Sequence, residues 1–373
     1  MRASAPLFSF LLAISAQALD TLGLSNGVKD LSTANFDLSL VSDSQVLSSL
    51  RPSGKEFDFS PSRFLPYRAE KRSASARRPV KQVPSTDALG ESDLAKTLPS
   101  SFPLKVTRKW TDINGDLGLT FTLVNTGDET VELGGVGFPI EFNSIFFNYT
   151  AEEALGNCSL IDPYIGLGGG YLQVTPTSGT GPALVITPLG DTPFEAWGFL
   201  EEPKGEIPYQ SQVFEGFYQW QVLSKADAET EWRGVEPWNK PSSKHLHPGT
   251  SWTIGLRLSL AKGGVRNLGD TVQAAGTPYA VSVPGYIIPS DLEASLHLFT
   301  DKAVANMTTS PPRSFYITKD RDRNVWNLQP QPEVWGRVRL TYTDGVVQAV
   351  HYYITDSASE AIGKLGNFFN TKA

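Results

Sequence analysis

The sequence predicts an all-β fold, a large antiparallel β-sandwich followed by a C-terminal helix. Short segments in which apolar and polar residues alternate recur along most of the chain, which is the period expected of strands with one buried face. Glycine and proline separate these segments at short intervals, as in β-sandwiches. Helix signals are few, so helices do not build the predicted core.

The predicted strands follow one another closely, and two pairs of them form predicted hairpins. Asn114-Gly115 and Asp344-Gly345 suit two-residue turns with positive φ, so each joins the strands on either side of it. In chain order, the predicted strands are 36–40, 57–59, 104–110, 117–124, 130–138, 171–175, 183–188, 194–200, 214–223, 251–260, 279–283, 296–300, 314–318, 335–343 and 346–355.

Two sites have the spacing of a helical capping box. Ser357 and Glu360 precede an apolar stripe close to the 3.6-residue period, which predicts a helix that reaches the end of the chain. The apolar face of this helix needs a partner and consists of Ala361, Ile362, Leu365, Phe368 and Phe369. Ser290 and Glu293 have the same spacing, but 292–299 fits a strand equally well.

The N-terminus has the features of an export signal. An apolar run ends at Ala16-Gln17-Ala18, a small-x-small cleavage pattern, so the mature protein is predicted to be extracellular. No later segment is long enough to span a bilayer. Seven cations stand against one acid between residues 63 and 81, which predicts a solvated linker. The predicted parts are a signal peptide (1–18), N-terminal strands of the sandwich (19–62), a basic and flexible linker or loop (63–102), the supersandwich (103–355) and a terminal helix (356–373).

Composition excludes some partners and some kinds of site. The 373 residues include 32 Lys and Arg against 39 Asp and Glu, a formal net charge of −7, which disfavours a nucleic-acid partner. Cys158 is the single cysteine, so we predict a buried structural thiol and no internal disulfide. Asn148, Asn157 and Asn306 each begin an N-glycosylation sequon, in agreement with export.

The loop at 229–240 has the densest combination of acidic and aromatic residues in the chain. Indole rings stack on sugar rings while their N–H groups stay available, and polar side chains bond to sugar hydroxyls. The candidate carbohydrate-binding residues are Trp232, Arg233, Trp238 and Asn239. Under the alternative interpretation, the two tryptophans pack the loop onto a sheet.

Four residues in or after this loop are candidate catalytic groups. Glycoside hydrolysis needs two carboxylates, for which Glu231 and Glu236 are available. His245 and His247 share one face if they lie on a strand. A metal site would need a third ligand that the sequence does not supply, so neither a metal nor a cofactor is predicted. Gly166–Gly170 lacks the spacing of a nucleotide-binding loop and predicts a flexible turn.

Segments 36–40, 50–52, 57–59, 134–140 and 232–252 together resemble the front part of a secreted microbial family of unknown function that is similar to six-hairpin glycosidases. The resemblance implies an N-terminal β-supersandwich related in shape to galactose mutarotases, then a linker helix and an (α/α)6 barrel. It also implies that the catalytic acid and base lie in that barrel, where this sequence stops. Segment 356–373 would then be the start of the linker helix.

These observations lead to one expected function and two alternatives. The first expectation is the sandwich half of a secreted glycoside-hydrolase-like enzyme, which binds polysaccharide and whose helical barrel is a missing partner. The second is a mutarotase-like or polysaccharide-cleaving enzyme, with His245 or His247 as acid and Glu215 or Glu236 as base. The third is a non-catalytic interaction sandwich.

Overall fold

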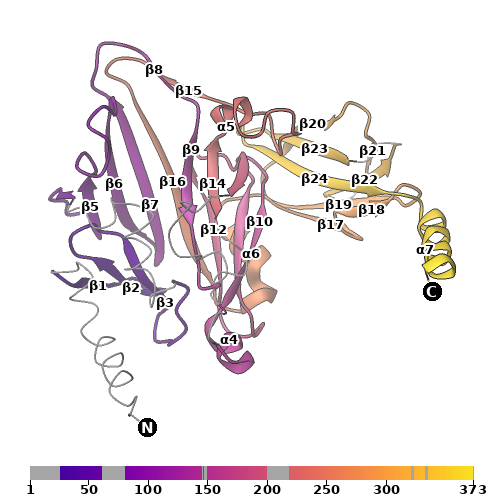
Figure 1. Cartoon of the computed structure of the whole chain (residues 1–373), viewed down its shortest axis with the longest axis horizontal. Helices are drawn as coiled ribbons and strands as arrows, with labels where there is room; N and C mark the ends of the chain where they lie inside the picture. The colour runs from indigo at the N-terminus through magenta and orange to yellow at the C-terminus, as the bar shows by residue number, and fades with distance from the viewer. Residues whose placement is uncertain are drawn as a thin grey trace, which may run out of the picture.

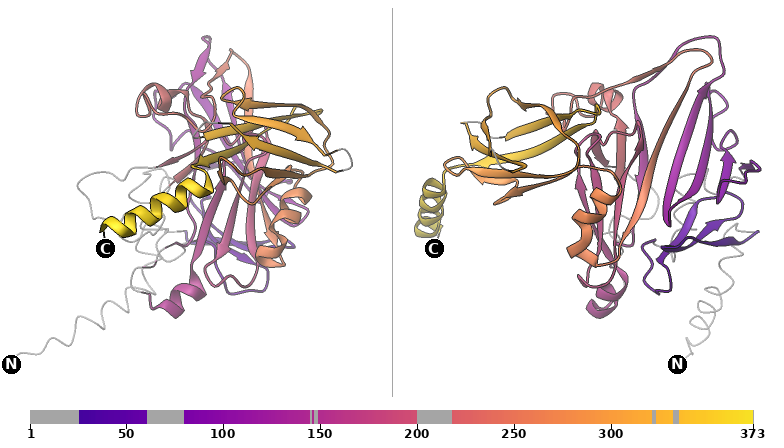
Figure 2. Two further views of the ribbon diagram at one scale, coloured as in Figure 1. Left: turned by 90° about the vertical axis from the view of Figure 1, so that its right-hand side faces the viewer. Right: turned by 180° about the vertical axis from the view of Figure 1, so that it is seen from behind.

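A computed structural model describes residues 26–60, 80–144, 146, 149–199, 218–320, 323–331 and 335–372. The predicted signal peptide (1–18), Asn148 and Glu215 lie outside these residues, as does 63–79 of the predicted linker. The described chain is built mainly from strands and ends in a helix, so the predicted fold class is confirmed. Figure 1 shows two β-rich bodies side by side, and the views in Figure 2 agree.

An eight-stranded antiparallel sheet is the largest element, with the order β10-β11-β12-β16-β7-β6-β5-β4. Both predicted hairpins exist: β6 pairs with β7 through Asn114-Gly115, and Asp344-Gly345 joins two later strands. The φ angles of Gly115 and Gly345 are +96° and +87°, as glycine permits. The strands are β4 (Lys81–Gln82), β5 (Gly90–Asp93), β6 (Leu104–Ile113), β7 (Asp116–Asn125), β10 (Ser159–Tyr164), β11 (Tyr171–Pro176), β12 (Ala183–Gly190) and β16 (Ser251–Ala261).

Three smaller sheets complete this first body, which we call the supersandwich. Their orders are β1-β2-β3, β13-β14-β9 and β15-β8. One apolar core joins these sheets to the large one, and Phe36, Leu117 and Trp220 lie fully buried in it. The strands are β1 (Val28–Ser32), β2 (Phe36–Val41), β3 (Leu47–Pro52), β8 (Val131–Leu133), β9 (Val136–Ile140), β13 (Ala196–Phe199), β14 (Tyr218–Leu223) and β15 (Lys244–Leu246).

The prediction of a flexible linker over 63–102 needs correction for its described part. Strands β4 and β5 lie in this segment and extend the large sheet beyond β6. Ser92 and Leu94 are buried there. The loop prediction missed β5 because this strand is short and mostly polar, and backbone pairing with β6 fixes it.

The predicted supersandwich at 103–355 is in fact divided between two bodies. Residues 279–355 form a separate C-terminal sandwich with its own apolar core, which includes Leu296, Trp326 and Leu340. Its sheets have the orders β17-β19-β22-β21 and β18-β24-β23-β20, and β18 pairs with β24 in parallel. The strands are β17 (Tyr279–Val283), β18 (Ile287–Pro289), β19 (Ala294–Phe299), β20 (Val304–Ser310), β21 (Phe315–Lys319), β22 (Val325–Pro330), β23 (Trp335–Tyr342) and β24 (Val347–Thr355).

The described helices are α4 (Ala151–Asn157), α5 (Lys225–Glu229), the 3-10 turn η2 (Gly264–Asn267), α6 (Leu268–Ala274) and α7 (Ala358–Lys372). Helix α7 confirms the capping-box prediction, because Ser357 Oγ accepts from Glu360 N at 3.3 Å and Glu360 Oε2 accepts from Ser357 N at 3.2 Å. At Ser290 the strand alternative is correct, since Ala294 and Leu296 of β19 alternate into the core. Figures 1 and 2 show α7 projecting beyond the C-terminal sandwich.

The glycine-rich turn at 166–170 joins the two bodies. Ala349 N of β24 donates to Gly166 O at 3.2 Å, and Gly169 N donates to Val347 O at 3.2 Å. A Cβ on Gly169 would lie 2.6 Å from Gln348 Cγ, so glycine permits this close approach. The segment is a turn as predicted, but it is packed against β24.

Candidate functional site

A loop at residues 224–242, which we call the junction loop, contains most of the predicted site. The buried carboxylate of Glu195 holds both of its ends. Glu195 Oε1 accepts from Ser224 N and from Ser242 N, each at 2.9 Å, and the hydroxyl groups of both serines also donate to this carboxylate. With one acceptor bonded at both ends, the long loop has a fixed position relative to β13 and β14.

Two amide side chains also hold the junction loop in place. Asn239 is 1% exposed, and its Nδ2 donates to Glu195 O at 3.0 Å and to Ile165 O at 3.2 Å. Gln221 Nε2 donates to Asp227 Oδ2 at 2.9 Å, and partial burial raises the pKa of Asp227. The prediction that Asn239 binds a sugar therefore needs correction, since its side chain lies inside the protein.

The middle of the junction loop bonds to the C-terminal sandwich through Arg337 of β23. Arg337 Nη2 donates to Glu236 Oε1 at 2.7 Å and to Pro237 O at 2.6 Å. The guanidinium carbon lies 4.6 Å from the centre of the Trp335 ring, in cation–π contact. Thus Arg337 has a carboxylate, a carbonyl and an aromatic face as partners.

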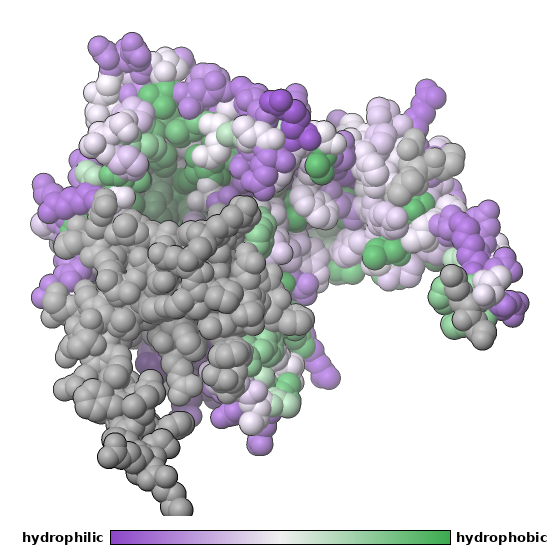
Figure 3. Space-filling model, in the orientation of Figure 1, coloured by the Kyte–Doolittle hydropathy of each residue, from purple (hydrophilic) through white to green (hydrophobic). Residues whose placement is uncertain are grey.

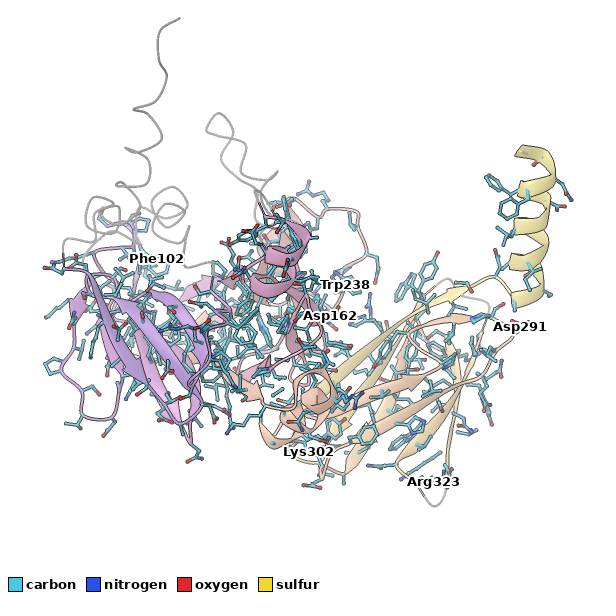
Figure 4. All side chains as sticks on the ribbon, turned by 90° about the horizontal axis from the view of Figure 1, so that it is seen from below. Phe102, Asp162, Trp238, Asp291, Lys302 and Arg323 are labelled. Carbon is cyan, nitrogen blue, oxygen red and sulfur yellow. The ribbon has the colours of Figure 1, made fainter. Side chains whose placement is uncertain are left out.

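Trp238 lies beside this ion pair and contacts His351 of β24. Its ring meets the imidazole edge-on, with 5.3 Å between the two ring centres, yet the Trp238 side chain remains 52% exposed. Burial lowers the pKa of His351 to about 4, with smaller contributions from Arg337 and Arg339, so the ring is neutral near pH 7. The neutral imidazole donates from Nε2 to Ile165 O at 2.9 Å. Figure 4 labels Trp238 on the side of the supersandwich that faces the C-terminal sandwich.

Strand register extends this arrangement into a continuous surface. Arg337 pairs with His351, and Trp335 pairs with Tyr353 on the same face of the sheet. Tyr353 is 52% exposed. The result is a set of aromatic and charged groups on the junction loop and on two paired strands, which we call the junction surface: Glu236, Trp238, Trp335, Arg337 and Tyr353.

Other predicted loop residues lie around α5. Arg233 donates from Nε and Nη2 to Glu229 O at 3.2 and 2.7 Å and so caps the end of that helix. Glu231 is exposed and Trp232 is partly buried. Trp232 N donates to Asp227 O at 2.8 Å, so this residue lies within the turn that follows α5.

The structure gives the predicted histidines partners other than Glu236. His245 Nε2 lies 3.7 Å from Glu132 Oε2, and Lys225 forms an ion pair with the same carboxylate at 2.7 Å. His247 Nδ1 lies 3.0 Å from Thr130 Oγ1. His245 therefore lies on β15 and His247 just after it, while Glu236 is bonded to β23.

The remaining predicted residues are placed as follows. Cys158 is fully buried, as predicted, and burial raises the pKa of its thiol to about 11. Asn157 is exposed at the end of α4, and Asn306 is exposed on β20. Among the described residues, no group of three histidine, cysteine or acidic side chains is arranged to hold a metal ion. No helix in the described ranges is long and apolar enough to cross a membrane.

Residues 67–373 match DUF5695, a family of unknown function, and this match covers most of the chain. The chain therefore belongs to that family, so the expected membership of a family of unknown function is confirmed. No curated protein matches the sequence.

Among solved structures, a polysaccharide lyase matches with a TM-score of 0.63 and 12% identity, over 90% of this chain and 48% of the lyase. A galactose mutarotase related enzyme from Lactobacillus acidophilus matches with a TM-score of 0.39 and 11% identity, over 64% of this chain and 98% of the enzyme. A putative aldose 1-epimerase from Escherichia coli K12 matches with a TM-score of 0.36 and 14% identity, over 62% of this chain and 98% of the epimerase. The likeness to the lyase is one of fold, and this chain spans about half the length of that protein.

Sequence reasoning missed Trp335, Arg337, Tyr353 and the positioning residue Glu195. Alternation over 335–343 was recognised as a strand, and it also places Trp335 and Arg337 on one face. That pattern was the available signal. The contact between Arg337 and Glu236 has no such local signal, because the two residues are 101 positions apart in the sequence.

Proposed function

We propose that this chain is the carbohydrate-binding sandwich part of a secreted polysaccharide-active enzyme similar to six-hairpin glycosidases, and that sugar binds on the junction surface. The observation that carries the proposal is the half-exposed Trp238 ring beside Glu236 and Arg337. An indole provides an apolar face for a sugar ring, while the carboxylate and guanidinium bond to hydroxyl groups. The fold shared with a polysaccharide lyase supports the same class of ligand.

The rigidity of the junction surface supports binding. Glu195 fixes the loop that contains Trp238, and strand pairing fixes Trp335 and Tyr353. Aromatic groups already held in place lose little conformational entropy when a ligand binds. The proposal assigns no catalytic residue to this surface.

The C-terminal helix supports a further part of the proposal. In α7, four apolar side chains are between 55% and 70% exposed: Ile362, Leu365, Phe368 and Phe369. An amphipathic helix normally packs such a face against another element. We assign that role to a helical barrel, the partner that the family resemblance implies.

Glycan-array or affinity-gel binding of the full chain tests the proposal, with Trp238→Ala beside wild type. We expect at least about a tenfold loss of affinity, the effect of removing one stacking ring worth about 1.4 kcal/mol. Tyr316→Ala is the matched control, because Tyr316 is 67% exposed on β21, in the other sheet of the C-terminal sandwich. Equal loss in both variants, or no binding of wild type to any glycan, would contradict the proposal.

Release of reducing sugar or of unsaturated product from a bound glycan is the second measurement. We expect none from this chain. Product formation that survives Trp238→Ala would place a catalytic site elsewhere on the two sandwiches. The alternative of an enzyme with its own site on the sandwich would then be favoured.

A further inference from the structure

Arg108 is a cation on the core-facing side of the large sheet. Its neighbours on that side of β6 are Val106 and Trp110, which are 7% and 5% exposed. The cross-strand partners of Arg108 are Ser92 of β5 and Phe121 of β7. A charge in this position loses most of its hydration, so it needs compensation from nearby groups.

Within the described ranges, other residues provide little of that compensation. Arg108 Nη2 donates to Ser44 O, and Arg108 Nε is buried with no hydrogen-bond acceptor. In the described ranges no carboxylate forms an ion pair with this guanidinium. Burial lowers the pKa of Arg108 to about 10, which still leaves the side chain positively charged at neutral pH.

Two buried hydroxyl groups also lack partners on these elements. Ser44 and Ser92 are 1% and 0% exposed, and neither Oγ has a hydrogen-bond partner among the described residues. Ser92 lies directly across from Arg108, and the carbonyl of Ser44 accepts from its guanidinium. Such unpartnered donors are rare in protein interiors, and here three belong to residues in contact or in register with one another.

Local structure fixes these groups in place. Trp110 Nε1 donates to Gln45 O at 3.0 Å, and Gln45 Nε2 donates to Ser42 O at 2.8 Å, which holds the turn that contains Ser44. A Cβ on Gly90 would lie 2.6 Å from Gln45 Oε1, so glycine makes room for the turn. The donors are thus preorganised.

The nearby acids of β5 lie on the opposite face of the sheet. Glu91 pairs with Lys109 at 4.0 Å and Asp93 pairs with Lys105 at 3.9 Å. Residues 91, 93, 105 and 109 alternate with Ser92 and Arg108 along their strands, so their side chains point away from the guanidinium. Neither of these two acids therefore compensates the charge of Arg108.

We propose that Arg108, Ser44 and Ser92 form an oxyanion-binding site that takes a carboxylate or sulfate group, either as a free small anion or as the acidic substituent of a saccharide. The planar guanidinium suits such a group, and both hydroxyls can donate to its oxygens. Arg108 keeps partial exposure. Figure 3 shows a hollow lined by apolar residues on the side of the supersandwich where β6 and β7 face β9.

Thermal unfolding of the full chain at constant ionic strength tests the site, with sodium sulfate, glucuronate and glucose as probes. We expect sulfate, glucuronate or both to raise the Tm of wild type by about 2–5 °C at saturation, and glucose to have no effect. A response to glucuronate alone identifies a saccharide acid as the ligand. A response to sulfate, with or without glucuronate, identifies a site that accepts free anions. No response to either anion, or an equal response to glucose, overturns the proposal.

Variants separate this site from general salt effects and from the junction surface. Arg108→Met should abolish the rise in Tm that the anions cause. Ser92→Ala should weaken it. Lys105→Met is the matched control, because it removes an exposed cation from the same strand, and it should keep the full response. Trp238→Ala should also keep the full rise in Tm. A failure of the proposed sugar site is thus distinguishable from a failure of the anion site. If Arg108→Met does not fold, Arg108→Lys should weaken the response because the planar fork is lost. An unchanged response in every variant at Arg108 or Ser92 would overturn the assignment.

Discussion

Arg337 and Arg108 are both partly buried arginines on strands, yet their surroundings are opposite. Arg337 bonds to a carboxylate and a carbonyl and contacts the Trp335 ring. Among the residues that the structure describes, Arg108 bonds to one carbonyl, and its Nε has no acceptor. Because desolvation of a charge is costly unless partners replace its water, the first arginine joins two bodies and the second requires a ligand.

The two arginines differ because a loop supplies partners to one of them and not to the other. The junction loop reaches Arg337 from the supersandwich and places Glu236 against it. Around Arg108 the nearby acids of β5 face outward and bond to lysines. A charge with several partners is typical of a structural contact, whereas a fixed buried donor without a partner needs an explanation, for which we propose a bound ligand.

The largest expected effect concerns the carboxylate that positions the junction loop. Glu195→Ala leaves four donors without their acceptor, two on the buried Ser224 and two on the partly buried Ser242. We expect the free energy of unfolding to fall by about 3–5 kcal/mol, measured by urea denaturation. Glu231→Ala, at an exposed position of the same loop, should change it by less than about 0.5 kcal/mol. Similar values for both variants would show that the Glu195 contacts do not hold the loop.

The next effect is a pH dependence from His351. Its pKa falls from the usual 6.5 to about 4 on folding, because burial and the neighbouring Arg337 and Arg339 disfavour the charged ring. Between these values the unfolded chain binds more protons than the folded chain, so stability falls as pH falls from 6.5 towards 4. The loss attributable to His351 is at most about 3 kcal/mol.

Urea denaturation of wild type and His351→Gln between pH 4 and 7 measures this dependence. The variant should lose the part of the slope that His351 contributes, while its neutral amide keeps a donor for Ile165 O. Parallel pH profiles for the two proteins would mean that the imidazole is not buried in its neutral form.

Much of the fold was predictable because its signals are local. Alternation located most strands, and Asn114-Gly115 and Asp344-Gly345 located two hairpins, since backbone sterics at two residues decide the turn. The division into two bodies was not predictable in this way. Strands of both cores have the same period, and only long-range packing separates Leu117 from Leu340.

The candidate site was predictable in part for the same reason. Trp238 was identified from composition, and it is exposed beside charged groups. Asn239 stands next to it in sequence but points inward, because bonds to Glu195 O and Ile165 O fix its amide. Arg108 did carry a local signal, a cation between the core residues Val106 and Trp110. What no local pattern shows is whether an acid elsewhere in the chain compensates such a charge.

The smallest expected effect tests the comparison of the two arginines directly. Arg337→Met removes the partner of Glu236 and of Pro237 O, so we expect it to destabilise the protein by about 1–2 kcal/mol. Arg108→Met replaces a poorly compensated charge with an apolar side chain of similar length, so without added oxyanions we expect it to stabilise the protein by about 1 kcal/mol or more. Both values come from urea denaturation in a chloride buffer. If both variants destabilise equally, the described contacts of Arg108 satisfy its charge as well as those of Arg337 do, and the distinction between a structural and a ligand-binding arginine fails.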